Sequence, residues 1–305
     1  MFHDTLPNID VKYKLKTNIG YGGTSSVFLS DLDGQSVALK CVRKDKGLER
    51  EQEKKLVLRE AEIIRKVGFH PNIINVIESH SEGVHDYLGV TDQVSYNVLE
   101  YCPNGSLFDF IKKNGPLGEN EACFYFKQLV YTIKHLHDKN IAHCDIKPGN
   151  IFLDEYFNLK LGDFGCAFSL QSKEYGITKG FGTKSYMAPE VFKASKGAPY
   201  SPFIADIFAL GCTLYFLVTG KIPLYSETCS SSTEEESDYI CSPSNVYIGN
   251  LEDLDLMVYD MIERCTAKNP GDRPDIKTMT THPWFDDRGD PDYLIKIFDY
   301  MKARS

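Results

Sequence analysis

The sequence predicts an α+β fold in which a small sheet-forming lobe precedes a larger helical lobe. Residues 12 to 42 alternate apolar and polar side chains between glycines, a pattern typical of twisted antiparallel strands. From about residue 104 onward, apolar residues recur at helical spacing instead. Strands first and helices afterwards indicate an α+β architecture.

One helix interrupts the strands of the first lobe. Residues 50 to 67 change to a helical period, and Gly68 ends the helix. The apolar face of this helix is formed by Val57, Ala61 and Ile64. Further strands are expected at residues 73–77 and 94–99, before the turn signal Asn104-Gly105.

The second lobe is expected to be mainly helical. One apolar stripe is formed by Ala122, Phe126, Leu129, Ile133 and Leu136. Helices resume near Pro202 and again over residues 251–265. The apolar stretch 203–218 contains Asp206 and is short for a membrane span, so it indicates a buried core helix.

These patterns place the lobe boundary near residue 101. We expect the sheet lobe over residues 1–101, the helical lobe over 102–285 and a C-terminal extension over 286–305. Within the helical lobe, residues 226–243 are rich in Ser and Glu, which indicates a flexible surface insertion.

The bulk composition narrows the class of protein. The 305 residues include 43 acids and 34 bases, a formal net charge of −9, so no nucleic-acid partner is expected. The nine cysteines form no CxxC pair, which argues against a disulfide framework or a zinc site. The N-terminus shows no signal-peptide pattern. We therefore expect an intracellular protein, cytoplasmic or nuclear, with no membrane partner.

A glycine-rich segment lies between two of the predicted strands. Gly20, Gly22 and Gly23 would let backbone amides approach phosphate oxygens without side-chain clash. A dinucleotide-binding loop would open a helix, and a Walker loop would carry GK[ST], so neither pattern fits. The segment instead indicates a phosphate-binding loop carried by strands.

Lys40 ends the apolar strand that begins at Val37. Taken alone, such a lysine is a solvated edge residue. The following helix carries Glu60, an acid that could hold Lys40 toward a nucleotide. At this point both interpretations stay open.

Four polar residues with complementary chemistry follow in loop-like segments of the second lobe. Asp145, Lys147 and Asn150 lie within residues 143–150, and Asp163 opens the motif Asp-Phe-Gly. Phosphoryl transfer requires a carboxylate to receive the hydroxyl proton, a cation near the transferring group and oxygen ligands for Mg²⁺. The four residues supply that set.

Gly182-Thr183 and the segment 186–190 (YMAPE) complete an ordered series of motifs. With all of them in this order, the chain resembles the catalytic domain of eukaryotic protein kinases from about Lys14 to Phe285. The resemblance implies the bilobal protein kinase fold, with ATP and Mg²⁺ as cofactors. Lys147 and Thr183 are typical of serine/threonine kinases, so the expected acceptors are Ser or Thr side chains of protein substrates.

The resemblance also implies a role for each site residue. Lys40, paired with Glu60, would bind the α- and β-phosphates, Asp145 would be the catalytic base, and Lys147 would steady the γ-phosphate. Thr183 would also belong to the catalytic residues. The ligands of Mg²⁺ would be Asn150 and Asp163. Besides the glycine loop, the nucleotide contacts would come from Val27, Ala38, Leu99, Glu100, Cys102, Ser106 and Phe152.

Structural support and rival functions follow from the same resemblance. Glu190 would form an ion pair with Arg273, and Asp206 would anchor the catalytic loop.

A pseudokinase scaffold is the main alternative function, because Ser25 replaces the last glycine of the phosphate loop. Such a scaffold would normally lack one of the transfer residues, and none is missing. The complete segment 182–190 argues for a peptide substrate over a small molecule.

Activation and substrate choice give further expectations. Cys144 stands where many kinases carry an arginine that pairs with activation-loop phosphate, so substantial activity is expected without that phosphate. The candidate acceptors in this loop are Ser172, Tyr175 and Thr178. Arginine-directed kinases carry acids at three positions that are here Ser106, Gly149 and Phe216, so only weak selection for arginine before the acceptor is expected.

The subfamily and the regulator stay open. Residues 282–285 (HPWF) and 100–111 are similar to calmodulin-dependent-type kinases. The mixed charges of residues 286–305, however, make a poor calmodulin target.

Overall fold

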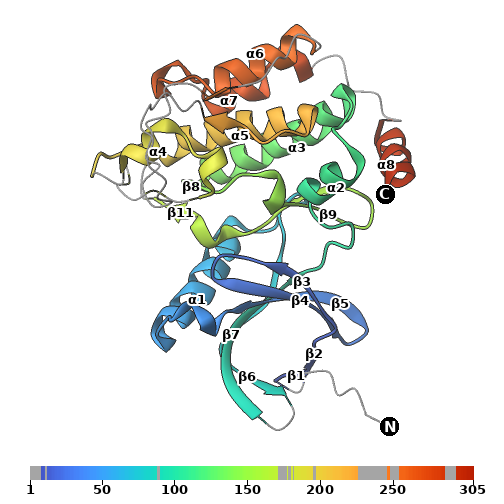
Figure 1. Ribbon diagram of the computed structural model, residues 1–305, viewed down its shortest axis with the longest axis vertical. Helices are drawn as coiled ribbons and strands as arrows, with labels where there is room; N and C mark the ends of the chain where they lie inside the picture. Colours follow the sequence, from blue (N-terminus) through green and yellow to red (C-terminus); the bar gives the residue numbers. More distant parts are fainter. Residues whose placement is uncertain are drawn as a thin grey trace, which may run out of the picture. The chain divides into compact units, whose positions relative to one another are not determined.

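The fold has a sheet-rich unit followed by a mainly helical unit. A computed structural model describes residues 8–10, 12–87, 90–170, 177, 180, 182–194, 197–225, 246–247, 254–285 and 293–305. The chain divides into two compact units, Met1–Pro103 and Asn104–Ser305. The first contains one α-helix beside an antiparallel sheet (Figure 1). The predicted α+β fold class is confirmed.

The sheet of the first unit has the strand order β2-β1-β6-β7-β5-β4-β3, with antiparallel neighbours. Its strands are β1 Asn8–Ile9, β2 Tyr13–Lys14, β3 Thr17–Tyr21, β4 Ser25–Leu32, β5 Gln35–Val42, β6 Val76–Tyr87 and β7 Val90–Glu100. Side chains alternate between the faces of a strand. Leu39 and Val98 therefore point into a buried cluster with Tyr13 on one face, and Ala38 and Lys40 point to the other.

Helix α1 spans Arg50–Val67, the predicted range. A capping box between Glu49 and Gln52 satisfies backbone groups at its start, and Gly68, with φ of 73°, ends it. The predicted apolar face is buried throughout: Val57, Ala61 and Ile64. The local sequence signals at both ends therefore fixed this helix.

The strand predicted at residues 73–77 is mostly wrong. β6 begins only at Val76, and the preceding Ile73 and Ile74 are buried outside the strand. The carboxylate of Glu100 accepts hydrogen bonds from the backbone N–H and the side-chain Nδ2 of Asn75, at 3.2 and 2.9 Å. Asn75 O also accepts from the backbone N–H of Glu100 at 3.0 Å, so Asn75 is bonded to Glu100 through both backbone and side chain just before β6 begins. The apolar pair Ile73 and Ile74 therefore marks burial rather than a strand.

The second unit is built around two long helices. Its helices are α2 Leu107–Asn114, α3 Glu119–Asp138, α4 Pro189–Ala194, α5 Pro202–Thr219, α6 Leu256–Cys265, α7 Ile276–Thr280 and α8 Tyr293–Arg304. Short strands are β8 Ile141–Ala142, β9 Ile151–Leu153, β10 Leu159–Leu161, β11 Phe168–Ser169, β12 Leu224–Tyr225 and β13 Val246–Tyr247. Figure 1 shows α3 and α5 side by side, with α6 and α7 beyond them.

Helices α3 and α5 form the core of this unit. The predicted stripe of α3 is fully buried: Ala122, Phe126, Leu129, Ile133 and Leu136. α5 is long and apolar enough to cross a membrane, but 83% of it is buried inside the protein. It is therefore the core helix that the sequence predicts. The predicted helix at 251–265 is shorter, because Asp255 caps α6 by accepting a hydrogen bond from Met257 N–H at 2.7 Å.

The C-terminal extension includes a helix that the sequence analysis did not anticipate. Ile297 and Met301 on α8 are buried. The guanidinium of Arg304 donates to backbone carbonyls at the end of α2, among them Gly115 O at 3.1 Å. α8 thus packs on the helical unit. The predicted insertion, residues 226–243, lies outside the described residues.

Candidate active site

The glycine-rich segment forms the turn between β3 and β4. The N–H of Gly22 donates to Ser25 O at 2.7 Å, which closes the turn. A Cβ atom on Gly23 would meet nothing within 4 Å, and one on Gly20 would make only ordinary contacts with Val27 at 3.8 Å. None of the three glycines has a positive φ. Because the fold itself leaves room for side chains at Gly20 and Gly23, their absence keeps the backbone open for close approach by a ligand.

Lys40 and Glu60 form an ion pair between β5 and α1. Lys40 Nζ lies 2.7 Å from Glu60 Oε1, and the two side chains are only 14% and 7% exposed. Lys40 is therefore no solvated edge residue. In the same sheet Val27 is the register partner of Lys40, and Leu99 is the partner of Ala38. These four side chains point to one face of the sheet.

Asn97 on β7 is a site residue that the sequence analysis missed. Its Nδ2 donates to Glu60 Oε2 and to the backbone O of Val57, both at 3.2 Å. An asparagine inside an apolar-looking strand run carries no motif. The available signal was its position two residues before Leu99, on the same strand face.

Glu100 and Cys102 lie at the end of the sheet unit. The carboxylate of Glu100 binds Asn75, as described above, and Cys102 is buried. The sequence predicts that both residues offer backbone groups to adenine. The side-chain contacts do not test this role, which stays a prediction.

Asp145 is the centre of a dense hydrogen-bond network in the second unit. Lys147 Nζ donates to its Oδ2 at 2.8 Å, and Asn150 Nδ2 donates to the same oxygen at 3.0 Å. The other oxygen, Oδ1, accepts from Thr183 N at 2.8 Å and from Thr183 Oγ1 at 2.9 Å. Lys147 Nζ also donates to Thr183 Oγ1 at 2.5 Å. Three of the predicted catalytic residues, Asp145, Lys147 and Thr183, thus meet in one place.

Buried Asp206 on α5 fixes the backbone that carries Asp145. Its two carboxylate oxygens accept from His143 N at 2.9 Å and Cys144 N at 2.8 Å. His137 Nε2 lies 2.9 Å from Asp206 Oδ2. This anchoring role agrees with the one that the resemblance implies. These bonds also hold Cys144 at a φ of 63°, in the left-handed region that residues other than glycine rarely adopt.

Gly182 permits the close approach of the segment that carries Thr183. Its φ is 104°, and a Cβ atom there would lie 2.5 Å from Cys144 O. Only glycine fits this position without displacing backbone. Gly182 therefore allows the close approach of the two segments, and Thr183 makes the hydrogen bonds between them.

Asn150 and Asp163 are the predicted Mg²⁺ ligands. Both hydrogens of the Asn150 amide have acceptors on Asp145, its backbone O at 2.8 Å and its carboxylate, so the amide oxygen is the atom left to face a cation. Asp163 has φ 56° and ψ 72° and begins a short 3₁₀ turn. Oxygen donors suit Mg²⁺, which usually takes few protein ligands and completes its shell with water and phosphate. The described residues contain no group of three or more His, Cys, Asp or Glu that could hold a metal, and the assignment of Asn150 and Asp163 stays a prediction.

Ser106 and Phe152 are bridge partners in the second unit. Ser106 caps α2: its Oγ accepts from Asp109 N at 3.1 Å and donates to Asp109 Oδ2 at 2.6 Å. The hydroxyl thus has a structural task. Nucleotide contacts by Ser106 and Phe152 stay predictions.

The predicted structural ion pair is confirmed. Arg273 Nη1 and Nη2 lie 2.6 and 2.8 Å from the two carboxylate oxygens of Glu190, and the Arg273 side chain is fully buried. The guanidinium also stacks over Phe208, 4.9 Å from the ring centre. The segment that follows Thr183 is therefore tied to the helical core.

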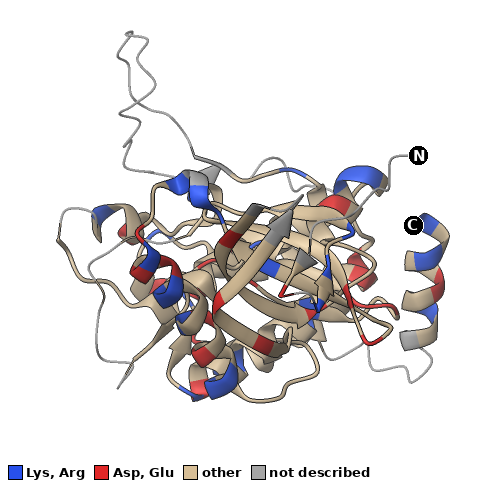
Figure 2. Ribbon diagram, turned by 90° about the horizontal axis from the view of Figure 1, so that it is seen from below, with Lys and Arg blue, Asp and Glu red and all other residues tan. Residues whose placement is uncertain are grey.

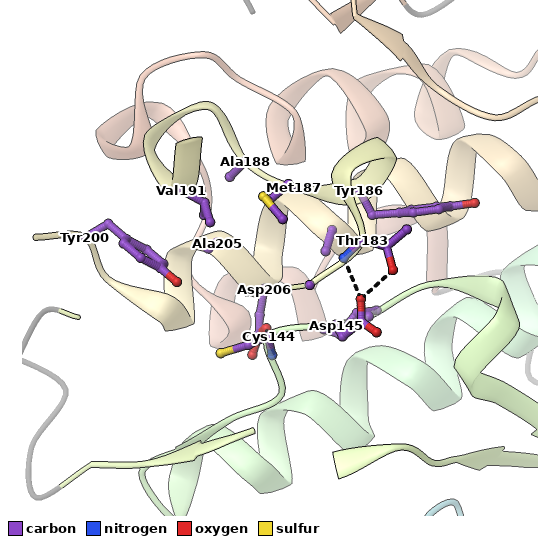
Figure 3. A pocket seen from close by; sticks show the side chains of 13 residues that line it. Cys144, Asp145, Thr183, Tyr186, Met187, Ala188, Val191, Tyr200, Ala205 and Asp206 are labelled. Atoms are coloured by element: carbon purple, nitrogen blue, oxygen red, sulfur yellow. Dashed lines mark hydrogen bonds between the residues drawn. The ribbon is translucent and has the colours of Figure 1, made fainter. Parts of the chain in front are cut away.

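A mostly apolar pocket lies beside Asp145 (Figure 3). Its wall includes Cys144, Tyr186, Met187, Val191, Tyr200 and Ala205. Figure 3 shows Thr183 bonded to Asp145 at one end, with Cys144 and Tyr200 farther along. Cys144 presents a short thiol side chain here. The candidate loop acceptors Ser172, Tyr175 and Thr178 lie outside the described residues.

Charges of both signs are spread over the described chain. Figure 2 shows Lys and Arg interspersed with Asp and Glu along the ribbon. Many of them form ion pairs, for example Lys54 with Glu82 at 2.6 Å.

A sheet unit with a lysine–glutamate pair and a helical unit with this aspartate network define the class of protein kinase catalytic domains. The sequence matches the protein kinase domain family over residues 13–285. The chain therefore belongs to the protein kinase family.

Three similar proteins all carry names of kinases, and two of them are named as serine/threonine-protein kinases. The cell cycle serine/threonine-protein kinase CDC5/MSD2 of Saccharomyces cerevisiae is 32% identical, over 88% of this chain and 36% of that protein. Serine/threonine-protein kinase GRIK2 of Arabidopsis thaliana is 31% identical, over 90% and 65% respectively. Sperm motility kinase 3A of Mus musculus is 30% identical, over 92% and 51%. The chain thus spans roughly a third to two-thirds of the length of these relatives.

Proposed function

We propose that the chain is an active serine/threonine protein kinase, which transfers the γ-phosphoryl group of ATP to hydroxyl groups of protein side chains. The observation that carries this proposal is the network around Asp145. Its carboxylate accepts hydrogen bonds from Lys147, Asn150 and Thr183. A base and a cation are thereby held side by side at one point, as phosphoryl transfer requires.

Each residue has a definite task in this proposal. Asp145 receives the proton of the acceptor hydroxyl, and Lys147 neutralises negative charge beside it. Lys40, oriented by Glu60, binds the phosphates of ATP. Mg²⁺ supplies further charge neutralisation when bound, and the residues that would hold it are Asn150 and Asp163.

The alternative is a pseudokinase scaffold that binds nucleotide without efficient transfer. It rests on Ser25, which stands in place of the last loop glycine. Ser25 is buried, and its backbone O accepts the hydrogen bond that closes the turn. Because the turn forms with Ser25 present and the Lys40–Glu60 pair is intact, we favour the active enzyme.

Phosphate transfer from radiolabelled ATP tests this proposal. The purified chain is incubated with Mg·ATP and three peptides that differ only in having Ser, Thr or Tyr as the acceptor. We expect labelling of the Ser and Thr peptides, little labelling of the Tyr peptide, and none above background with Asp145→Asn. Binding of ATP without peptide labelling would support the scaffold instead. Equal labelling by the parent chain and Asp145→Asn would overturn the assignment of the base.

A further inference from the structure

We propose that Asn97 is a positioning residue, which holds Glu60 in the orientation that directs Lys40 toward ATP. The inference rests on the proposed function, because it assigns a task within ATP binding. Asn97 is the register partner of Lys40 on the neighbouring strand. It is only 1% exposed. An amide at such a buried position needs hydrogen-bond partners to offset the loss of water.

The amide of Asn97 faces α1 with its nitrogen. Nδ2 donates one hydrogen bond to Glu60 Oε2 and one to Val57 O. Turning the amide over would set its oxygen against these two acceptor oxygens, so the assignment is fixed by its neighbours. Within the described part of the chain, Asn97 Oδ1 has no hydrogen-bond partner. The hydrogen bonds of this side chain are therefore all made by its amide nitrogen.

The two oxygens of Glu60 have different partners. Oε1 accepts from Lys40 Nζ at 2.7 Å, and Oε2 accepts from Asn97 Nδ2 at 3.2 Å. A carboxylate held at one oxygen can still rotate, whereas two donors in different directions fix its plane. Since the Glu60 side chain is only 7% exposed, water is poorly placed to replace the donor on Oε2.

Asn97 also ties the helix backbone to the sheet. Val57 lies three residues before Glu60, so the bond to Val57 O holds the same turn of α1 that presents Glu60. A further hydrogen bond joins the start of α1 to the sheet: Arg50 Nη2 donates to Ser81 O at 3.1 Å. Hydrogen bonds therefore set the position of α1 together with its apolar face, and Asn97 makes two of them next to the catalytic pair.

Two near-isosteric variants test this role. Asn97→Leu removes both donors, and Asn97→Asp places an acceptor against Glu60. Ser95→Ala is the matched control, because Ser95 lies on the same strand face, is buried, and donates to Ser81 O at 2.8 Å without contacting Glu60. The measurements are the Kd of Mg·ATP by calorimetry, the KM for ATP, kcat for a peptide, and Tm.

We expect Asn97→Leu to raise the Kd and the KM for ATP about tenfold, the size of one lost buried hydrogen bond to a charged group. Asn97→Asp should raise both further. Ser95→Ala should lower Tm to a similar extent and leave ATP affinity unchanged. A loss of Tm in the Asn97 variants with unchanged ATP affinity would overturn the proposal, because it would assign Asn97 to folding alone.

A double-mutant cycle with Glu60→Gln separates positioning from general destabilisation. If Asn97 acts through Glu60, Asn97→Leu should have little further effect on the ATP Kd in the Glu60→Gln background. An undiminished effect there would contradict the proposal. A parent chain that binds Mg·ATP but labels no peptide would refute the proposed kinase activity while this cycle still tests Asn97, because the Kd needs no turnover.

Discussion

The two units hold their site residues in different ways. In the helical unit, Asp145 is held by Lys147 and Asn150, two and five residues away in the sequence, and by Thr183. In the sheet unit, Lys40 and Glu60 come from a strand and a helix twenty residues apart. In the first arrangement, two of the three partners come from the same loop as Asp145 and Thr183 comes from 38 residues farther along. The second depends entirely on how α1 packs against the sheet.

This difference predicts different failures. A substitution in the Asp145 network should remove a chemical group while the surrounding loop keeps its shape, so the rate falls and ATP binding persists. A substitution that shifts α1 should move the Lys40–Glu60 pair, so ATP binding weakens first. Substitutions in the sheet unit should therefore weaken ATP binding by amounts that depend on how far they shift α1.

The largest effect is expected at Asp206, on which the loop depends. Asp206→Asn would replace one carboxylate oxygen by an NH₂ donor, which would face the backbone N–H of either His143 or Cys144. We expect a loss of about 2–4 kcal/mol in the free energy of unfolding, since buried donors are left without an acceptor, and loss of activity. Urea unfolding and the peptide assay measure both quantities.

Asp154 provides the control for that variant. It lies in the same unit and accepts from Tyr156 N at 2.9 Å and Asn158 N at 2.8 Å in a surface turn. Asp154→Asn should cost about 1 kcal/mol or less and keep the rate. Similar losses of stability and rate in the two aspartate variants would contradict the proposed anchoring role of Asp206.

An intermediate effect is expected at Thr183. Its hydroxyl accepts from Lys147 and donates to Asp145. Thr183→Ala should lower kcat about tenfold, the size of one hydrogen bond to a charged group, whereas Thr183→Ser should retain most of the rate. Equal losses in the two variants would indicate that the methyl group matters and the hydroxyl does not.

Selection for arginine before the acceptor should be weak, about threefold or less. Phe216 is buried and stacks on Phe108 with ring centres 5.3 Å apart, and Lys112 Nζ lies 5.8 Å from the Phe216 ring. A cation therefore stands where a carboxylate would be needed. A positional peptide library measures this preference. Strong arginine selection would require another acid, for example Asp109, which is hydrogen-bonded to Ser106.

The smallest effect concerns Cys166, beside the Asp-Phe-Gly motif. Burial raises the pKa of its thiol to about 11, with the charges of Asp145 and Asp163 acting in the same direction. At pH 8 about a thousandth of it is thiolate, so alkylation by iodoacetamide should be slow and should quicken about tenfold per pH unit toward that pKa. Mass spectrometry of Cys166 gives the rate. Fast labelling that does not change with pH would show that the thiol is exposed and activated.

The sequence predicted those parts of the fold that local signals determine. The helical period of residues 50–67 and the stop at Gly68 gave α1 its bounds, and the apolar stripe of α3 gave its buried face. The strand at 73–77 begins only at Val76, because the apolar character of Ile73 and Ile74 reflects burial, which does not distinguish a strand from irregular backbone. Helix α8 was missed because its packing on the helical unit is a tertiary effect.

The same distinction applies to the site. Asp145, Lys147, Asn150 and Asp163 stand in recognisable motifs, and the structure brings the first three together with Thr183. Asn97 stands in no motif: it became visible only when strand register and helix packing placed it against Glu60. Residues that act through another residue are set by tertiary geometry, which the linear pattern does not carry.

The most direct test of the central claim is a steady-state comparison of Asp145→Asn with Glu60→Gln, with kcat and the KM for ATP measured separately. Asp145→Asn should lower kcat by about 10²–10⁴-fold with little change in the KM for ATP. Glu60→Gln should instead raise the KM for ATP as its main effect, with a smaller loss of kcat. An Asp145→Asn enzyme with the parent kcat, or a Glu60→Gln enzyme with the parent KM, would contradict the division of tasks between the two units.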